Sequence, residues 1–158
     1  GANAIKLEGG RDFAATVTAL VKASIPVMGH LGLTPQSVHK LGGYSVQGKD
    51  EDARKTIIED ARILVDCGVC SMVLEKVPEE LARDISEMIP VPTIGIGAGR
   101  YCDGQVLVLH DMLGMDESFR PKFLKTYASL FDISKKAVQE YHDEVRGKKF
   151  PEEKHAYH

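Results

Sequence analysis

Two charged residues, Lys6 and Glu8, lie two positions apart in the short segment AIKLE at residues 4–8. Side chains alternate across a β-strand, so this spacing places both charges on one face. A lysine can hold a carboxylate, and a glutamate can hold a metal ion or its bound water. A Lys–Glu pair on a solvated edge explains the spacing equally well, and both interpretations stay open.

A histidine and a second glutamate end two other apolar segments. His30 lies near the end of PVMGHL at 26–31, and Glu75 ends SMVLE at 71–75. A carboxylate at the carboxyl end of a strand is well placed to act as a general base. The alternatives are a histidine that is satisfied at the rim of the core, and a surface glutamate paired with Lys76.

A glycine cluster, GIGAG at residues 95–99, follows a further apolar segment. Glycines let backbone N–H groups approach a phosphate. The spacing lacks the full dinucleotide-binding pattern, and no clear helix follows it. A tight turn explains the cluster equally well.

The elements that must position these residues alternate between strand and helix patterns. Strands are predicted at 4–8, 26–31, 71–75, 92–98 and 105–110, and helices at 11–23, 50–67, 78–87, about 121–130 and 134–146. This alternation predicts an α/β protein with a parallel sheet and crossover helices. Polar residues gather at the carboxyl ends of the predicted strands: Lys6, Glu8, His30, Glu75, His110 and Asp111. That end is the active-site edge in a (βα)8 barrel and in a doubly wound sheet, and the pattern does not choose between them. The long polar stretch at 32–49 is predicted to be a functional or disordered loop.

Composition excludes some function classes. The 158 residues are 43% hydrophobic, and the net charge is −3, so a general nucleic-acid binder is not expected. No apolar run approaches the length of a membrane span, and no signal peptide is visible, so no membrane partner is expected. An odd number of cysteines, three, is typical of a reducing compartment, and we expect a cytoplasmic protein. The sequence opens Gly1-Ala2-Asn3 and enters a strand at once, which suggests a start inside a domain.

Several short segments are specific as a series. In chain order they are KLEGG at 6–10, GHLGLTPQ at 29–36, GGY at 42–44 with VQG at 46–48, VLE at 73–75, IGIGAG at 94–99, DGQ at 103–105 and LHD at 109–111. This series resembles the ketopantoate hydroxymethyltransferase family. The resemblance runs from about Ala2 to His158.

The resemblance implies a fold, a reaction and roles for four residues. The family is a (βα)8 TIM barrel related to the phosphoenolpyruvate mutase and isocitrate lyase group. It transfers a hydroxymethyl group from 5,10-methylenetetrahydrofolate to 3-methyl-2-oxobutanoate, with Mg²⁺, and so makes ketopantoate for pantothenate and coenzyme A. By resemblance, Lys6 and His30 would bind the 2-oxo acid, Glu8 would belong to the Mg²⁺ site, and Glu75 would be the catalytic proton acceptor.

One departure from the family pattern bears on activity. Residues 1–158 match the C-terminal part of a single barrel domain, about strands 4–8 and the C-terminal helices from about residue 121. Two Mg²⁺-binding aspartates of the family, and a serine beside one of them, belong to the first three strands. An arc of five strands leaves two bare edges and an open core. We therefore expect that this chain is not the whole functional unit.

Assembly follows from the same resemblance. Family members are homo-oligomers, often decamers, whose C-terminal helices commonly reach a neighbouring subunit. The segment 134–146 presents Ala137, Val138, Tyr141 and Val145 on one face, which fits docking against another surface.

Three other functions remain as alternatives. The first is another Mg²⁺-dependent lyase or mutase of the same barrel group, acting on a 2-oxo acid or phosphoenolpyruvate without folate. The second is a phosphate or flavin-phosphate binding module built on residues 95–99, which a yellow colour would reveal. The third is an inactive structural fragment.

Overall fold

The computed structural model describes residues 1–37 and 45–157. These residues form two compact units, 1–106 and 107–158, and each is described by itself. Part of the long loop predicted at 32–49, and the GGY segment at 42–44, lie outside the described residues. The assignment of the whole chain to one barrel domain stays a prediction.

The first unit is built around a parallel sheet of five strands in the order β1-β2-β3-β4-β5. The strands are β1 (Ile5–Glu8), β2 (Val27–Gly32), β3 (Ser71–Glu75), β4 (Thr93–Ile96) and β5 (Gly104–Gln105). The helices that connect the first four strands are α1 (Ala14–Lys22), preceded by a 3₁₀ turn at Arg11–Phe13, α2 (Glu51–Asp66) and α3 (Glu79–Met88). A short 3₁₀ turn at Pro35–Ser37 follows β2.

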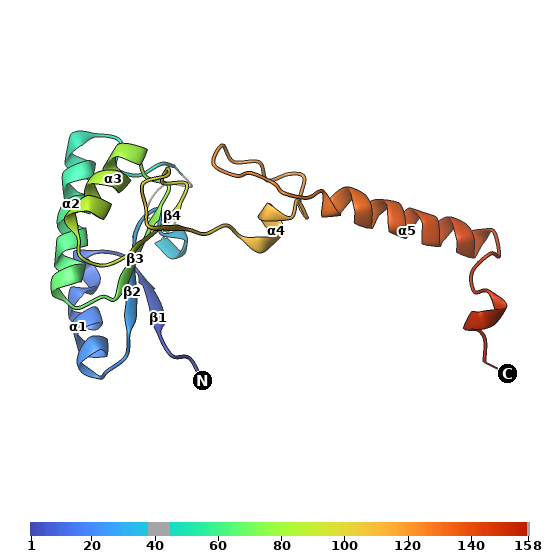
Figure 1. Ribbon diagram of the computed structural model, residues 1–158, viewed down its shortest axis with the longest axis horizontal. Helices are drawn as coiled ribbons and strands as arrows, with labels where there is room; N and C mark the ends of the chain where they lie inside the picture. The colour runs from blue at the N-terminus through green and yellow to red at the C-terminus, as the bar shows by residue number, and fades with distance from the viewer. Residues whose placement is uncertain (38–44, 158) are drawn as a thin grey trace. The chain divides into compact units, whose positions relative to one another are not determined.

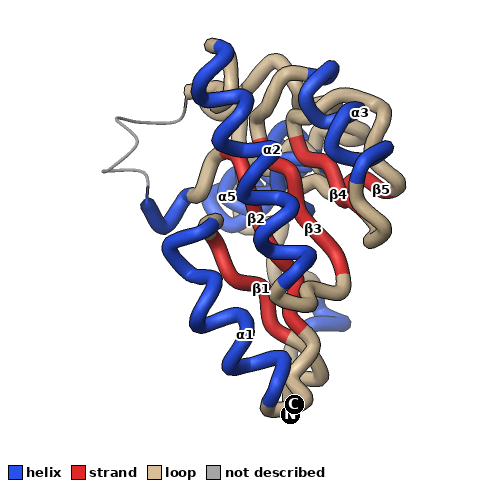
Figure 2. The backbone as a smooth tube through the Cα atoms, turned by 90° about the vertical axis from the view of Figure 1, so that its left-hand side faces the viewer, coloured by secondary structure: helices blue, strands red, loops and turns tan. Residues whose placement is uncertain are grey.

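The strand order separates the two fold classes that the sequence left open. A doubly wound sheet reverses its strand order and carries helices on both faces. Here the strands follow one another in chain order, and α1, α2 and α3 all lie on the same side of the sheet (Figures 1 and 2). This is the arrangement of a (βα) barrel arc, as the resemblance implied.

The core lies between the sheet and this layer of helices. Strand residues Val27, Leu31, Met72 and Leu74 are buried there against helix residues that include Leu64, Leu81 and Ile85. Burying a side chain of this size contributes about 1.5–3 kcal/mol. Because strand side chains alternate, a β2 or β3 residue next to one of these core residues points to the opposite face. His30 and Glu75 occupy such positions.

Helix ends follow local chemistry. The Asp50 side chain accepts a hydrogen bond from the Ala53 backbone N–H and so caps α2, which also has acidic residues in its first turn. Gly68, with φ of +93°, follows the helix in the left-handed conformation that often ends helices.

The boundaries predicted from the sequence for α2, α3 and β1 to β4 agree with the structure within two residues.

The strand predicted at 105–110 is wrong beyond Gln105. The chain makes one more bond to the sheet, from the Val106 N–H to the Gly95 carbonyl, and then leaves it. Residues His110 and Asp111 lie in the short helix α4 (Leu109–Met112), and not at a strand end. A short apolar run satisfies strand and helix patterns alike, so its sequence could not exclude this outcome.

The helix predicted at about 121–130 is also wrong, because its backbone groups bond elsewhere. The N–H groups of Tyr127, Leu130 and Phe131 donate to the carbonyls of Met112, Leu113 and Gly114. These bonds hold the segment as a loop against α4 and the turn that follows it. The predicted helix at 134–146 is confirmed, and it begins earlier, as α5 (Leu130–Arg146).

No helix in residues 1–37 or 45–157 is long and apolar enough to span a membrane.

Asp103 ties the start of β4 to the turn that leads into β5. Its Oδ2 accepts hydrogen bonds from the Thr93 backbone N–H at 2.7 Å and from the Thr93 hydroxyl at 3.0 Å. Thr93 is fully buried, and its hydroxyl also lies 2.7 Å from that of Ser86. Because the backbone and side chain of Thr93 donate to the carboxylate, the pKa of Asp103 lies below its ordinary value.

We predict that Asp103→Asn lowers the thermal stability in a pH-dependent way. A depressed folded-state pKa adds stability above the unfolded pKa, about 3.9 for aspartate, and this stability is lost as the pH falls through the folded value. The melting temperatures of the two proteins should therefore differ at neutral pH and converge in acid. Calorimetry between neutral and acid pH measures this, and a difference that stays constant with pH would contradict the account.

Candidate active site at the carboxyl ends of the strands

Register brings the four predicted site residues to one face of the sheet. Glu8 of β1 pairs with His30 of β2, and Gly32 of β2 pairs with Glu75 of β3. Lys6 lies two residues before Glu8, and His30 lies two residues before Gly32, so all four side chains share a face. The three strands lie side by side, and this face is the one that α1, α2 and α3 do not cover (Figures 1 and 2).

His30 is the centre of the group. Its side chain has no exposed surface, and its Nδ1 lies 3.6 Å from Oε1 of Glu8 while its Nε2 lies 3.3 Å from Oε2 of Glu75. Neither ring nitrogen makes a well-aligned hydrogen bond within the described residues. Buried polar atoms are almost always hydrogen-bonded, and the Glu8 and Glu75 carboxylates are the polar groups that the structure places beside these two nitrogens.

Glu8 is nearly buried, with 10% of its side chain exposed. Its Oε2 accepts a hydrogen bond from the Gln36 backbone N–H at 3.0 Å. Oε1 faces His30 and lies 4.0 Å from Nζ of Lys6. A carboxylate with one oxygen held by the backbone and one turned toward the site fits a single ligand position for Mg²⁺, or a hydrogen bond to its bound water.

The described residues do not supply a complete metal site. No group of three or more His, Cys, Asp and Glu residues in 1–37 and 45–157 has the geometry to hold a metal ion. Glu8 therefore fits a Mg²⁺ site as one contributor, and not as part of a complete set of side-chain ligands within the described residues.

Lys6 is half exposed, and its ion pair with Glu8 is at the limit of contact. Such a pair is worth little to stability, which leaves the ammonium group available to an anionic ligand. Glu75 is more shielded, with 18% of its side chain exposed, and the contact resolved for its carboxylate is the one to His30. The four residues thus combine a cation, two shielded carboxylates and a buried imidazole.

Backbone contacts fix the end of β3 and were not foreseen from the sequence. The Leu33 N–H donates to the Glu75 carbonyl at 2.8 Å. Gly32 has φ of +91°, and a Cβ at this position would lie 2.2 Å from the same carbonyl oxygen. Only glycine allows β2 to pass this close to Glu75, and Gly32 at the end of GHLG was the available signal.

The glycine cluster at 95–99 has a structural explanation. Gly99 has φ of +76°, and a Cβ there would lie 2.4 Å from Cγ of Glu79 in the first turn of α3. Arg100 pairs with the Glu79 carboxylate, and the Gln105 side chain donates to the Gly99 carbonyl. Because the Gly99 turn packs directly against the Glu79 side chain, the tight-turn interpretation fits better than the phosphate-binding one.

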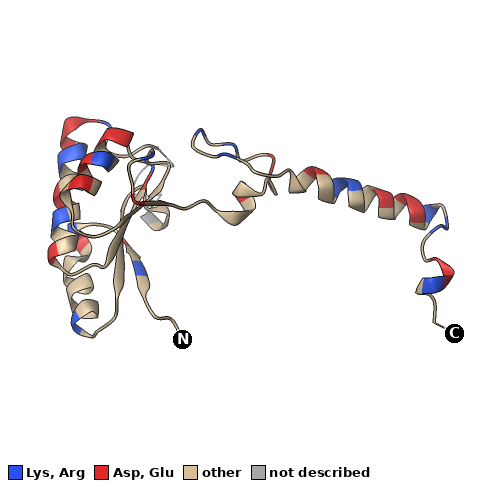
Figure 3. Ribbon diagram, viewed as in Figure 1, with Lys and Arg blue, Asp and Glu red and all other residues tan. Residues whose placement is uncertain are grey.

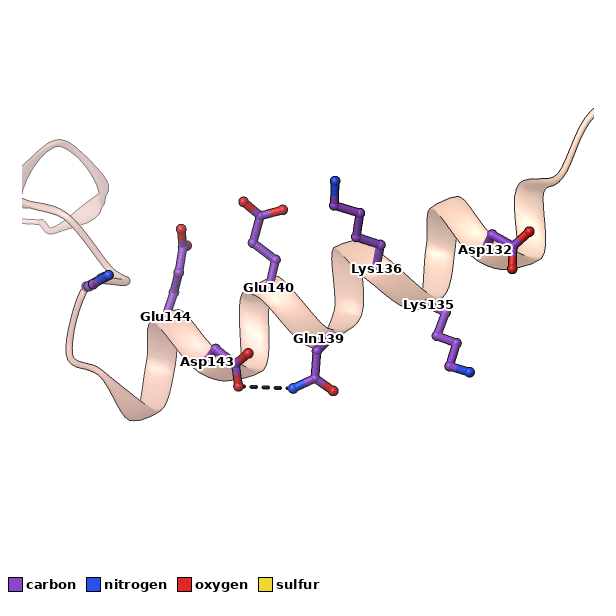
Figure 4. A pocket seen from close by; sticks show the side chains of 8 residues that line it. Asp132, Lys135, Lys136, Gln139, Glu140, Asp143 and Glu144 are labelled. Carbon is purple, nitrogen blue, oxygen red and sulfur yellow. Dashed lines mark hydrogen bonds between the residues drawn. The ribbon is translucent and has the colours of Figure 1, made fainter.

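His110 and Asp111 belong to the second unit. A cavity of about 720 Å³ in the second unit follows the exposed side of α5. Figure 4 shows charged side chains that point outward from the helix, and Figure 3 shows both signs of charge interspersed along it. The lining residues are Asp132, Lys135, Lys136, Gln139, Glu140, Asp143, Glu144 and Lys149. This mixture is typical of a solvated helix and carries no site.

Comparison with known proteins identifies the same family that the series of sequence segments resembles. A family model described as ketopantoate hydroxymethyltransferase matches residues 1–153. A protein of Thermoanaerobacter sp. (strain X514) is 56% identical over 157 residues, which are 99% of this chain and 57% of the relative. One from Clostridium botulinum (strain 657 / Type Ba4) is 57% identical with the same coverage, and one from Thermosipho melanesiensis is 55% identical with 60% of its length covered.

Each of these relatives is named 3-methyl-2-oxobutanoate hydroxymethyltransferase. The chain thus spans 57–60% of the length of these relatives. Since the family model covers nearly all of its residues, this chain belongs to the ketopantoate hydroxymethyltransferase family.

Proposed function

We propose that this chain supplies part of the active site of an enzyme that transfers a hydroxymethyl group from 5,10-methylenetetrahydrofolate to 3-methyl-2-oxobutanoate. The product is ketopantoate, and the reaction begins with Mg²⁺-assisted enolisation of the 2-oxo acid. The names of the relatives support the product. The observation that carries the proposal is the fully buried His30 between Glu8 and Glu75, with Lys6 on the same face.

The first chemical task is to remove the weakly acidic proton from C3 of the 2-oxo acid. Glu75 takes this proton, because Glu8 is assigned to the cation and Glu75 is the other carboxylate that lies beside His30. Lys6 pairs with the substrate carboxylate, and a ring nitrogen of His30 hydrogen-bonds the bound molecule. Glu8 would hold the cation or its water, and bound Mg²⁺ would supply Lewis acidity to the 2-oxo acid.

Transfer then completes the reaction. The enolate carbon attacks the methylene carbon of the folate-derived iminium and forms a new carbon–carbon bond. One water molecule supplies the hydroxyl oxygen to the methylene carbon as the C–N bond to the folate breaks, and the folate nitrogen takes up a proton, so ketopantoate and tetrahydrofolate are released. The described residues hold no group of three or more candidate side-chain ligands, so we propose that further ligands belong to the part of the barrel that the relatives have beyond this chain.

Assembly is also part of the proposal. Helix α5 exposes apolar side chains along its length, including Ile133, Val138, Tyr141 and Val145. An amphipathic helix of this kind is stabilised when its apolar face packs against another surface. We propose that α5 docks within a homo-oligomer, for which a decamer is the expected form.

We predict that Glu75→Gln slows exchange of the C3 proton of 3-methyl-2-oxobutanoate by about 10²–10⁴-fold, the usual contribution of a general base. Exchange in deuterated buffer with Mg²⁺ and without folate is followed by proton NMR. The protein is assayed alone and joined to the additional segment of a relative. Glu79→Gln is the matched control, because Glu79 lies in α3 and pairs with Arg100.

Exchange at the unsubstituted rate in Glu75→Gln would remove Glu75 from the role of base. Cleavage of a carbon–carbon bond without folate would point to a lyase of the same barrel group. Absence of exchange from both forms of the unsubstituted protein would sink the enolisation mechanism.

We predict that Lys6→Met raises the KM for 3-methyl-2-oxobutanoate with a smaller effect on kcat. A charge-assisted hydrogen bond contributes about 1.5–3 kcal/mol, so KM should rise by about 10–100-fold. Steady-state kinetics measures both constants. Lys22→Met, in the last turn of α1, is the control. An unchanged KM would show that the Lys6 ammonium does not hold the substrate.

A further inference from the structure

Lys76, the residue after Glu75, has an unusual backbone conformation for its place in the fold. It is one of three non-glycine residues with positive φ in the described part of the chain, at 47°. The other two, Ser24 and Lys148, follow the ends of α1 and α5. A left-handed residue is common after a helix. Lys76 instead follows a strand, where no such habit accounts for it.

Main-chain hydrogen bonds hold the peptide groups on both sides of Lys76. Its N–H donates to the Ile96 carbonyl at 2.9 Å, and its carbonyl accepts from the Gln47 N–H at 2.8 Å. The Glu75 carbonyl accepts from the Leu33 N–H at 2.8 Å. The ends of β2 and β4 and the segment that enters α2 therefore all bond to the two peptide groups that flank the Lys76 Cα.

The left-handed turn changes the face of the sheet to which the next side chain points. In a continued strand, residue 77 would share the face of Glu75, because strand side chains alternate. Val77 is instead buried in the core with the helices, 3% exposed, and Pro78 then leads into α3. The turn at Lys76 thus separates a carboxylate on the site face from an apolar residue in the core.

We propose that the left-handed backbone of Lys76 is a positioning device that fixes the direction of the Glu75 carboxylate. The proposal rests on the function above, in which Glu75 is the base. In this proposal Lys76 acts through its backbone dihedrals. Strain of this kind persists where the surrounding structure holds it, as the three hydrogen bonds do here.

The test compares residues that accept this conformation with one that does not. Glycine and asparagine adopt positive φ readily, whereas a β-branched residue is a strong outlier there. Lys76→Gly and Lys76→Asn remove the ammonium group and still allow a positive φ at residue 76. Lys76→Val removes the ammonium group and disfavours a positive φ. Each is assayed by C3 exchange, in whichever form of the protein catalyses it, with kcat expressed per folded molecule.

Lys76→Val should lower kcat by about tenfold or more, because small displacements of a reacting group cost up to about 100-fold. Its KM should stay within about twofold, since substrate binding does not use this residue. Lys76→Gly and Lys76→Asn should retain activity. The matched control is Ser24→Val, which places valine at a left-handed position with φ of 62° after α1. It should lower the melting temperature and leave kcat unchanged.

Three results would overturn the proposal. Equal losses of kcat in the glycine, asparagine and valine variants would assign the effect to the ammonium group. A lower melting temperature in Lys76→Val with normal kcat would reduce the turn to a structural role. If Lys76→Val does not fold, Lys76→Ala replaces it, and a kcat no lower than that of Lys76→Gly would count against the proposal. No exchange in the unsubstituted protein would remove the proposed function itself, and the inference with it.

Discussion

The parallel register of β1, β2 and β3 is the constraint on which the candidate site depends. It places Glu8 opposite His30, and Gly32 opposite Glu75, so that three strands deliver their polar ends to one place. A slip of one residue would turn each of these side chains to the other face and bring apolar residues to the site. The buried core therefore protects the site, because a slipped strand would also lose its packing against α1, α2 and α3.

The two faces of the sheet carry different kinds of residue because side chains alternate between the faces along each strand. Leu31 and Leu74 point to the helices, while their neighbours His30 and Glu75 point to the other face. Parallel sheets are normally covered on both faces. A buried imidazole between two carboxylates is costly for folding alone, since its nitrogens make no well-aligned hydrogen bond within the described residues. Its placement is understandable if a bound 2-oxo acid and cation complete the arrangement.

Much of the first unit could be predicted from the sequence because its elements are marked locally. The strand predicted for the segment SMVLE begins and ends at the same residues as β3, and Asp50 and Gly68 mark the ends of α2. The errors lie in the second half, where the apolar run after Gln105 leaves the sheet and the segment after Pro121 bonds to α4 and its following turn. Those outcomes depend on which backbone N–H and carbonyl groups form hydrogen bonds with each other, and residue types alone do not predict these pairs.

The same limit applies to the site. Spacing in AIKLE shows that Lys6 and Glu8 share a face, but the contact of His30 with two carboxylates depends on the register between strands. The positive φ of Lys76 has no signal in the residue itself, because lysine is not a residue that favours it. Long-range backbone bonds to Ile96 and Gln47 impose it, and they are visible only in three dimensions.

The most direct test of the proposed function is transfer of an isotope label. Methylenetetrahydrofolate labelled at the methylene carbon is mixed with 3-methyl-2-oxobutanoate, Mg²⁺ and the protein, joined to the additional segment of a relative where the chain alone is inactive. The account predicts that the label appears in the hydroxymethyl group of ketopantoate and that chelation of the metal stops its appearance. Label that stays in the folate, while a full-length relative transfers it under the same conditions, would contradict the account.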